Sequence, residues 1–324
     1  MVSVTIGNSA TNIGDRTFAY CSRLTAVTVA PLNANYSSID GILFNKGQSL
    51  LILCPGDETG GVTITNSVTN IGEYALQRCS GLTNIIIGNS VAGIAGSAFA
   101  WCSGLTTITL PDSVTSIGES AFEHCPNLTS VTAPNSVTSI GDWAFSDCLG
   151  LARVTIGNSV TSIGSYAFYN CAGLTGVTIG SSVTSIGWYA FLNCFNLNSM
   201  FFRGNAPYAI WAPPPSGGPP LGYPTISYYL PGTSGWEATY CGQPAYLLNP
   251  APQTSGPSFG VGTNGFGFNI TGTADIPIVV EASTNLTAAA WVPLQSCTLT
   301  NGLIYFSDPA WTNFPTRAYR IRSP

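Results

Sequence analysis

A block of 23 residues repeats along the first two thirds of this 324-residue chain. One copy, residues 105 to 127, reads LTTITLPDSVTSIGESAFEHCPN, and neighbouring copies begin at Leu82, Leu128, Leu151 and Leu174. A fixed period of this length means that each repeat is one supersecondary unit, and that neighbouring units stack to bury each other's apolar faces. The period therefore predicts a solenoid, in which each repeat forms one rung.

The pattern inside one repeat predicts a short strand followed by a turn and a short helical segment. We number each repeat from its leading Leu, so that Leu105, Ile108 and Leu110 occupy positions 1, 4 and 6. This alternation of apolar and polar residues is typical of a strand with one buried face. Phe122 and Cys125 follow at positions 18 and 21, at the spacing of one helical turn. We expect both side chains in the core.

The composition excludes several classes of protein. Apolar residues make up 45% of the chain, which argues against general disorder. Lys and Arg together number 9 and the net charge is -5, so the chain lacks the basic field that a nucleic-acid partner requires. No apolar run is long enough to predict a transmembrane segment.

The repeated pattern LTxVTIxNSVTSIGxxAFxxC closely resembles the BspA-like class of bacterial leucine-rich repeats, over residues 1 to 206. The segment YSSIDGILFNKGQSLLILCPG, within residues 31 to 61, resembles the hairpin insertion of that family. The resemblance implies a leucine-rich-repeat solenoid, exposure on the bacterial surface, and adhesion or ligand binding. It implies no particular ligand.

The start of the chain predicts further sequence upstream. Val4 and Ile6 are in phase with Ile108 and Leu110, so the chain begins inside a rung and without a polar cap. Residues 1 to 9 also lack the basic start and apolar core of a signal peptide. We expect the natural protein to carry a cap and an export signal before Met1, and to reside outside the cell or on its surface.

The period fails after residue 206, and two further regions are predicted. Residues 207 to 257 combine a Pro/Gly-rich linker, APPPSGGPP, with a segment that resembles the C-terminal cap of such arrays. Residues 258 to 324 contain short β runs separated by turn signals and predict a small all-β module. Its segments VVEASTNL, YFSDP and RAYRIRSP resemble the C-terminal module of exported repeat proteins from environmental bacteria. Within this module we expect Glu281 to form a structural ion pair with Arg320 or Arg317.

The chain has ten cysteines, and most of them form one row at the 23-residue spacing. The row consists of Cys21, Cys79, Cys102, Cys125, Cys148, Cys171 and Cys194. Adjacent rungs would bring these side chains close enough for disulfides, but their Cβ vectors would run parallel, and buried Cys also serves as a small apolar filler. We favour packed free thiols. We expect neither a metal nor a cofactor, because there is no CxxC pair and His124 is the single histidine.

Acidic residues recur at position 15, as Asp15, Glu73, Glu119 and Asp142. Two carboxylates on neighbouring rungs would be separated by about 5 Å, the separation in retaining glycosidases. The alternative is that each acid stabilises the first turn of a short helix through its dipole. We favour this structural explanation, and we regard His124 as an even weaker catalytic candidate. The sequence therefore predicts a protein that is not an enzyme.

Aromatic residues gather at the variable positions 15, 16, 19 and 20. They are Tyr20, Tyr74, Trp101, Trp143, Tyr166, Tyr169, Trp188 and Tyr189. Aromatic rings on a rigid, weakly charged solenoid suit contact with a glycan or a protein, because they offer area at a low entropic cost. Half-burial between rungs is the alternative explanation. Our candidate binding residues are Trp143, Tyr166, Tyr169, Trp188 and Tyr189.

A second candidate surface is the exposed face of the strands. It offers rows of Thr and Ser hydroxyls with Arg153 as its charged residue, a flat array that suits ice or a crystalline polysaccharide. Taken together, the sequence predicts an exported, non-enzymatic binding or adhesion protein that recognises a protein or glycan partner. The alternatives are a structural spacer or display scaffold without a ligand and, third, a carbohydrate-active enzyme.

Overall fold

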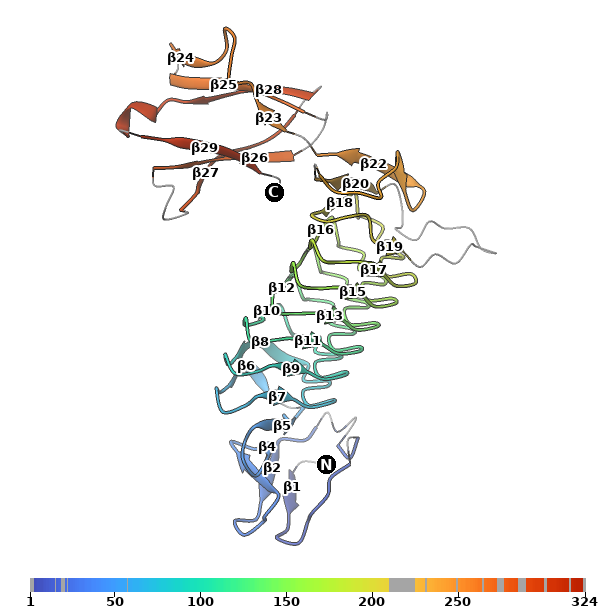
Figure 1. The fold of residues 1–324 in the computed structure, drawn as a ribbon. Helices are drawn as coiled ribbons and strands as arrows, with labels where there is room; N and C mark the ends of the chain where they lie inside the picture. Colours follow the sequence, from blue (N-terminus) through green and yellow to red (C-terminus); the bar gives the residue numbers. More distant parts are fainter. Residues whose placement is uncertain are drawn as a thin grey trace. The chain divides into compact units, whose positions relative to one another are not determined.

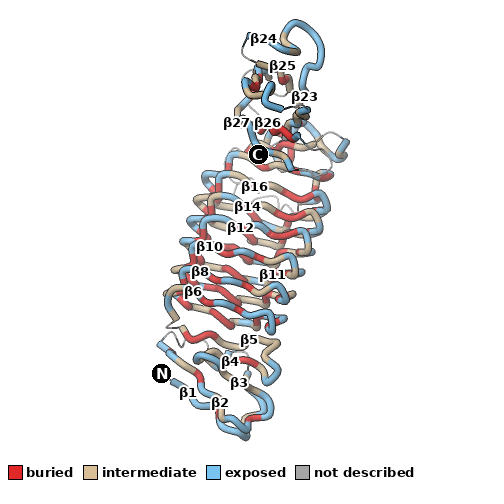
Figure 2. The backbone as a smooth tube through the Cα atoms, turned by 90° about the vertical axis from the view of Figure 1, so that its left-hand side faces the viewer, coloured by how far each residue is buried: buried red, intermediate tan, exposed pale blue. Residues whose placement is uncertain are grey.

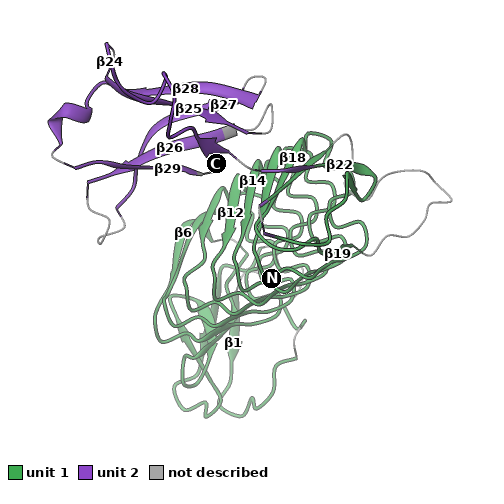
Figure 3. Cartoon of the chain, turned by 45° about the horizontal axis from the view of Figure 1, so that its top comes forward, with its two compact units in different colours: residues 1–229, 233–245 green, residues 230–232, 246–324 purple. Residues whose placement is uncertain are grey.

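The structure is a computed structural model, and it describes residues 3–14, 16–18, 21, 23–56, 58–209, 225–230, 232–248, 250–263, 265–272, 277–284, 290–299, 302–314 and 316–322. The chain divides into two compact units (Figure 3). The first contains residues 1–229 and 233–245, and the second contains residues 230–232 and 246–324. The predicted linker APPPSGGPP lies outside the described residues, and the predicted boundaries at 206 and 257 remain predictions.

The first unit is a solenoid built mainly from parallel strands that stack from rung to rung (Figure 1). The first strand of a rung is paired so that residues 23 apart face each other, as Val131, Val154 and Val177 do. These strands are β6 (Thr59–Ile64), β8 (Gly81–Ile87), β10 (Thr107–Thr109), β12 (Ser130–Ala133), β14 (Arg153–Ile156), β16 (Gly176–Ile179), β18 (Ser199–Phe202) and β20 (Ile226–Tyr229). Their outward surface is called the strand face below.

A second series of short parallel strands forms another side of each rung, at positions 12 and 13. It consists of β7 (Asn70–Ile71), β9 (Gly93–Ile94), β11 (Ser116–Ile117), β13 (Ser139–Ile140), β15 (Ser162–Ile163), β17 (Ser185–Ile186) and β19 (Tyr208–Ala209). In the odd-numbered strands from β7 to β17, a buried Ile follows a more exposed residue. Each of these strands therefore closes the core of its rung with one apolar side chain.

The N-terminal part contains an antiparallel insertion. β1 (Ser3–Ile6) pairs in parallel with β2 (Ala26–Val29), and β3 (Tyr36–Ile39), β4 (Ile42–Asn45) and β5 (Leu50–Leu53) then form an antiparallel meander. Asp40 and Gly41 connect β3 to β4 with φ of 51° and 81°, the left-handed pair that a tight hairpin turn requires. β5 pairs in parallel with β7, so the insertion ends by rejoining the solenoid.

Identical side chains stack in columns through the core, and buried residues recur at matching places from rung to rung (Figure 2). The most regular is the phenylalanine column: Phe99, Phe122, Phe145, Phe168 and Phe191. Its neighbouring ring centroids lie 4.9 to 5.3 Å apart with planes within 4° of parallel. Every member is fully buried. Each rung therefore depends on its neighbours for the burial of its largest side chain.

The short helical segment predicted at positions 15 to 21 is not confirmed, because this side of the rung is a run of turns. Tyr74 N–H and Leu76 N–H donate to the carbonyls of Gly96 and Ala98 in the next rung, whereas Ala75 N–H donates back to Gly72. A helix would direct all of these donors along its own axis. Stacking instead lets every second amide satisfy a carbonyl of the neighbouring rung. The variable positions 15, 16, 19 and 20 on this side are called the turn edge below.

The end of the first unit and the second unit are also built from strands. β21 (Thr239–Tyr240) pairs with β22 (Gln243–Leu247) as an antiparallel hairpin. In the second unit β25 (Gly265–Thr271) pairs with β23 (Ala251–Pro252), β24 (Gly260–Gly262) and β28 (Leu303–Asp308), and β26 (Pro277–Ser283) pairs with β27 (Val292–Thr298) and β29 (Ala318–Arg322). A single 3₁₀ turn, η2 (Trp311–Asn313), is the helical element among the described residues.

The expected ion pair of the second unit is confirmed. Arg320 Nε lies 2.6 Å from Glu281 Oε2, and the Glu281 side chain is 5% exposed. Arg317 lies beside a different acid, with its Nε 3.1 Å from Asp308 Oδ2. Both pairs join residues of this unit to each other, which is the structural role predicted for Glu281. No helix among the described residues is long and apolar enough to cross a bilayer.

Candidate functional site

Four of the five predicted binding residues form one packed group on the turn edge. The rings of Trp143 and Tyr166 stack with centroids 4.0 Å apart and planes within 3° of parallel. Tyr169 packs edge-on against both rings, at 6.0 and 5.7 Å, and Tyr189 tilts against Tyr166 at 5.3 Å. All four are half-buried. Stacking between rungs therefore covers one face of Trp143 and fixes the position of its neighbours.

Trp188 differs from the other four residues. Its ring is 46% exposed and meets Tyr189 edge to face, at a centroid distance of 6.4 Å. No described aromatic ring stacks on either face of Trp188. The five residues, called the aromatic cluster below, thus present one open indole beside four rings that hold each other in place.

A second group on the turn edge joins an aromatic ring to charged residues. Trp101 is 41% exposed, and His124 stacks on it with ring centroids 3.8 Å apart. Arg78 lies over the same indole, 5.1 Å from its centroid. His124 Nε2 is 3.6 Å from Asp147 Oδ2, and Asp147 Oδ1 accepts a hydrogen bond from Asn170. These contacts link consecutive rungs, so His124 and Asp147 have a structural explanation here.

The backbone of the turn edge explains why its side chains point outward. Positions 16 and 20 are left-handed in six consecutive rungs, with φ between 53° and 65°. They are occupied by Tyr74, Ser97, Ser120, Trp143, Tyr166 and Tyr189, and by Arg78, Trp101, His124, Asp147, Asn170 and Asn193. A left-handed residue other than Gly costs about 1–2 kcal/mol. The stacked rungs compensate for this cost through the hydrogen bonds between them.

Among the acids at position 15, Asp142 connects two rungs. Asp142 Oδ1 accepts a hydrogen bond of 2.7 Å from the backbone N–H of Ser165, which lies 23 residues later. The helix-dipole explanation is not confirmed, because the described residues on this side of the rung form turns and no helix. Asp15 and Tyr20 lie outside the described residues. On the same edge Arg16 donates a hydrogen bond to the Tyr74 hydroxyl and lies over its ring.

The cysteine row is buried from Cys79 onward, whereas Cys21 is half-buried, and the thiols of the row are free, as predicted. From Cys102 onward each Sγ donates to a carbonyl 26 residues earlier, as Cys148 does to Phe122 at 3.2 Å. Burial raises the pKa of Cys102 to about 12, and it holds the pKa of the Cys148 and Cys171 thiols well above the usual range. Cys102, Cys148 and Cys171 are therefore protonated hydrogen-bond donors rather than nucleophiles. Among the described residues, no three His, Cys, Asp or Glu side chains gather as a metal site.

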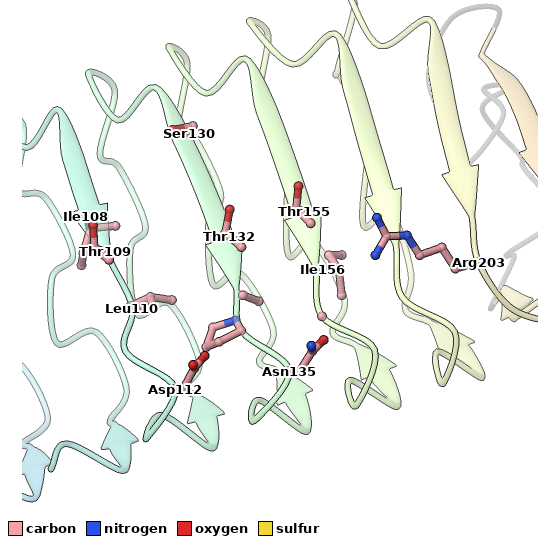
Figure 4. Close-up of a pocket in the computed structure, with 13 residues that line it drawn as sticks. Ile108, Thr109, Leu110, Asp112, Ser130, Thr132, Asn135, Thr155, Ile156 and Arg203 are labelled. Atoms are coloured by element: carbon pink, nitrogen blue, oxygen red, sulfur yellow. The ribbon is translucent and has the colours of Figure 1, made fainter. Parts of the chain in front are cut away.

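The strand face carries a groove of about 550 Å³ (Figure 4). Its floor includes Thr109, Thr132 and Thr155, which stand on β10, β12 and β14. Asp112 and Arg203 also line it, and Arg203 extends back over the neighbouring strand toward Thr155. Sequence reasoning identified the hydroxyl rows but missed Arg203. Arg203 would have been found by continuing the 23-residue numbering past the last regular repeat, because it falls at position 7 of the next rung.

A family model described as the BspA type leucine rich repeat region matches the chain in six copies, over residues 1–53, 58–148 and 92–208. A comparison with curated proteins found no match. Among solved structures, a leucine-rich repeat protein from Eubacterium ventriosum is similar, with 24% identity and a TM-score of 0.58. The match covers 67% of this chain and 61% of that protein, so the chain spans about three fifths of its length.

Two further bacterial proteins show weaker similarity. The pneumococcal vaccine antigen PcpA is 19% identical, with coverage of 72% of this chain and 51% of that one and a TM-score of 0.49. A leucine-rich repeat protein from T. pallidum is 25% identical, and the match covers 60% of this chain and 71% of that protein, with a TM-score of 0.41. The comparison with the Eubacterium ventriosum protein shows a shared solenoid fold.

Proposed function

The chain belongs to the family of BspA-type leucine-rich repeat proteins, and from this premise we propose that it is an exported, non-enzymatic binding protein. The proposed contact surface is the aromatic cluster on the turn edge, and the partner is a protein or a glycan. The observation that carries the proposal is the open indole of Trp188, 46% exposed beside four rings that are already packed.

The packing of the cluster supports binding in a specific way. Trp143, Tyr166, Tyr169 and Tyr189 restrain each other through stacked and edge-on contacts, so little side-chain entropy is lost when a partner covers them. An exposed Trp with a rigid surround is a typical anchor of an interface. Asp142 and Asp147, two acids of the same edge, already accept hydrogen bonds from the next rung.

A structural spacer is the second candidate, and one observation favours it. The face-to-face stack of Trp143 and Tyr166 joins two rungs and would stabilise a solenoid that has no ligand. The two functions differ in what they predict for Trp188, which stacks on no described ring and so contributes little to the join between rungs. A binder needs this side chain, whereas a spacer does not.

The test is to apply fluorescently labelled protein to a printed glycan array and to intact bacterial and epithelial cells. We expect wild-type protein to bind at least one surface and Trp188→Ala to lose that binding at least tenfold. Trp101→Ala is the matched control, since Trp101 is similarly exposed on distant rungs of the same edge. Absence of binding by the wild-type protein, or equal binding by Trp188→Ala, would favour the spacer.

A further inference from the structure

The groove on the strand face contains hydroxyls that the protein does not use. Threonines at positions 2 and 11 bond to the carbonyl 23 residues earlier, as Thr129 and Thr138 do at 3.2 and 3.1 Å. The groove threonines at position 5 differ. Within the described chain the hydroxyls of Thr109, Thr132 and Thr155 have no hydrogen-bond partner. They form a row of donors and acceptors at the strand spacing of about 4.8 Å.

One end of the groove carries an unpaired cation. Arg203 is exposed, and its guanidinium forms no ion pair or hydrogen bond with the described residues. Figure 4 shows its side chain directed back across the neighbouring strand, toward Thr155. Gly157 also lines the groove, and a Cβ there would lie 2.4 Å from the Pro134 carbonyl, so the backbones of neighbouring rungs approach closely at this position.

The other end carries an acid that interrupts a regular series. At position 8, Asn66 and Asn135 accept hydrogen bonds from the backbone N–H of Asn89 and Asn158, each at 2.8 Å. Asp112 occupies the same position between these pairs, is exposed, and forms no such bond among the described residues. Asp112 and Arg203 lie on rungs four steps apart, about 19 Å at the strand spacing. The groove is therefore elongated, polar along its floor, and charged with opposite signs at its ends.

We propose that this groove binds an oligosaccharide that carries an isolated carboxylate, such as a single uronic acid. The Arg203 guanidinium would hold the carboxylate with two parallel hydrogen bonds. Sugar hydroxyls donate and accept as threonine hydroxyls do, and Asp112 accepts from further hydroxyls. This site lies on a different face from the aromatic cluster, so the proposal stands independently of the proposed function.

The groove residues argue against the other classes of ligand. A peptide gains affinity by burying large apolar anchors, but Ile108 and Leu110 are each only 8% exposed in this groove. A polyanion such as nucleic acid needs several cations, and Asp112 would repel it. A neutral glycan would leave Arg203 without a partner. The combination of one cation with a hydroxyl row fits a sparsely charged glycan.

The test is titration calorimetry of the full chain with a panel of oligosaccharides that each carry one glucuronate, galacturonate or sialate. The same panel as methyl esters keeps the hydroxyls and removes the charge. We expect at least one acid to bind, with an affinity loss of about tenfold or more on esterification or in Arg203→Gln. In Arg203→Gln, esterification should have little further effect. Thr132→Val, which keeps the β-branched shape, should weaken binding several-fold.

The control is Arg153→Gln, since Arg153 is an exposed arginine on β14 that does not line the groove. It should bind like the wild type, and Trp188→Ala should too, which separates this proposal from the one for the turn edge. The proposal is overturned if no acid in the panel binds, if the esters bind equally, or if Arg153→Gln loses binding while Arg203→Gln retains it. Tighter binding of a Glu-rich peptide would also overturn it.

Discussion

The core columns and the turn edge lie within the same rungs, yet they follow opposite rules. In the core the same residue recurs at each step, as in the parallel rings of Phe122 and Phe145. On the turn edge the backbone conformation recurs, with φ near 55° at position 16, while the side chain changes from Ser120 to Trp143 to Tyr166. Stacking thus fixes the rung through its interior and leaves the exterior free to vary.

This difference shows where stability and recognition are expected to reside. A buried side chain is covered by the rungs above and below, so any change creates a cavity or an unpaired group. A turn-edge side chain is held by a backbone whose amides already bond to the next rung. Replacing a turn-edge side chain that stacks on no described ring, such as Trp188, is therefore expected to change the surface without changing the packing between rungs.

The largest effect is expected in the phenylalanine column. Phe122→Ala removes a fully buried ring that stacks on Phe99 and Phe145, at 4.9 and 5.1 Å. We expect a loss of about 3–5 kcal/mol in the free energy of unfolding. Denaturant titration followed by circular dichroism measures it. A loss below about 1 kcal/mol would mean that the ring is not central to its rung.

Alkaline pH should weaken the cysteine row. Burial raises the pKa of Cys102 from 9.0 to about 12, so the folded protein keeps a proton that the unfolded chain loses. Stability is therefore fully present below pH 9 and decreases as the pH rises toward 12. Melting temperatures at pH 7.5, 9 and 10.5 measure this decrease. Cys102→Ser, which keeps a donor for the Leu76 carbonyl, should flatten the decrease; an unchanged slope would exclude Cys102 as a source.

A smaller effect is expected from the loss of a single thiol hydrogen bond. Cys148→Val fills a similar volume but removes the donor to the Phe122 carbonyl, which lies 3.2 Å from Cys148 Sγ. Leaving a buried carbonyl unpaired costs about 1–3 kcal/mol. Cys148→Ser retains a donor and serves as the control in the same denaturant titration. If Val proved no more destabilising than Ser, the thiols would act as filler alone.

The smallest effect is expected on the strand face. Thr107 is exposed, and its hydroxyl approaches Asn84 at 3.5 Å, a marginal contact. Thr107→Ala should change the free energy of unfolding by no more than about 0.5 kcal/mol. The same denaturant titration checks it, and an effect as large as that of Phe122→Ala would mean that inward and outward faces are reversed.

The sequence predicted what depends on the period. The strands, the inward positions of Phe122 and Cys125, and the free thiols all follow from residues that repeat, because each copy restates the same burial pattern. The turn edge was predicted as helical because Ala, Phe and Cys recur at helical spacing. That spacing cannot distinguish a helix from left-handed turns, since Trp and Tyr give no local signal for positive φ at Trp143 and Tyr166.

The candidate sites were predictable only in part. The aromatic residues were identified from their variable positions, but which ring is stacked and which is open depends on contacts between rungs. Trp143 and Trp188 look equivalent in sequence, and the structure separates them by stacking and exposure. Arg203 was missed because it follows the last regular repeat, where the position-7 residue changes from Gly180 to Arg.

The most direct test of the account compares one ring from each region in the same two assays. Phe122→Ala and Trp188→Ala each remove an aromatic side chain, and both are measured for melting temperature and for binding to the surface that retains wild-type protein. We predict that Phe122→Ala lowers the melting temperature by about 10 °C or more while the folded fraction still binds. Trp188→Ala should melt within about 2 °C of wild type and lose binding at least tenfold. A Trp188→Ala protein that melts as early as Phe122→Ala, or that binds like the wild type, would contradict the account.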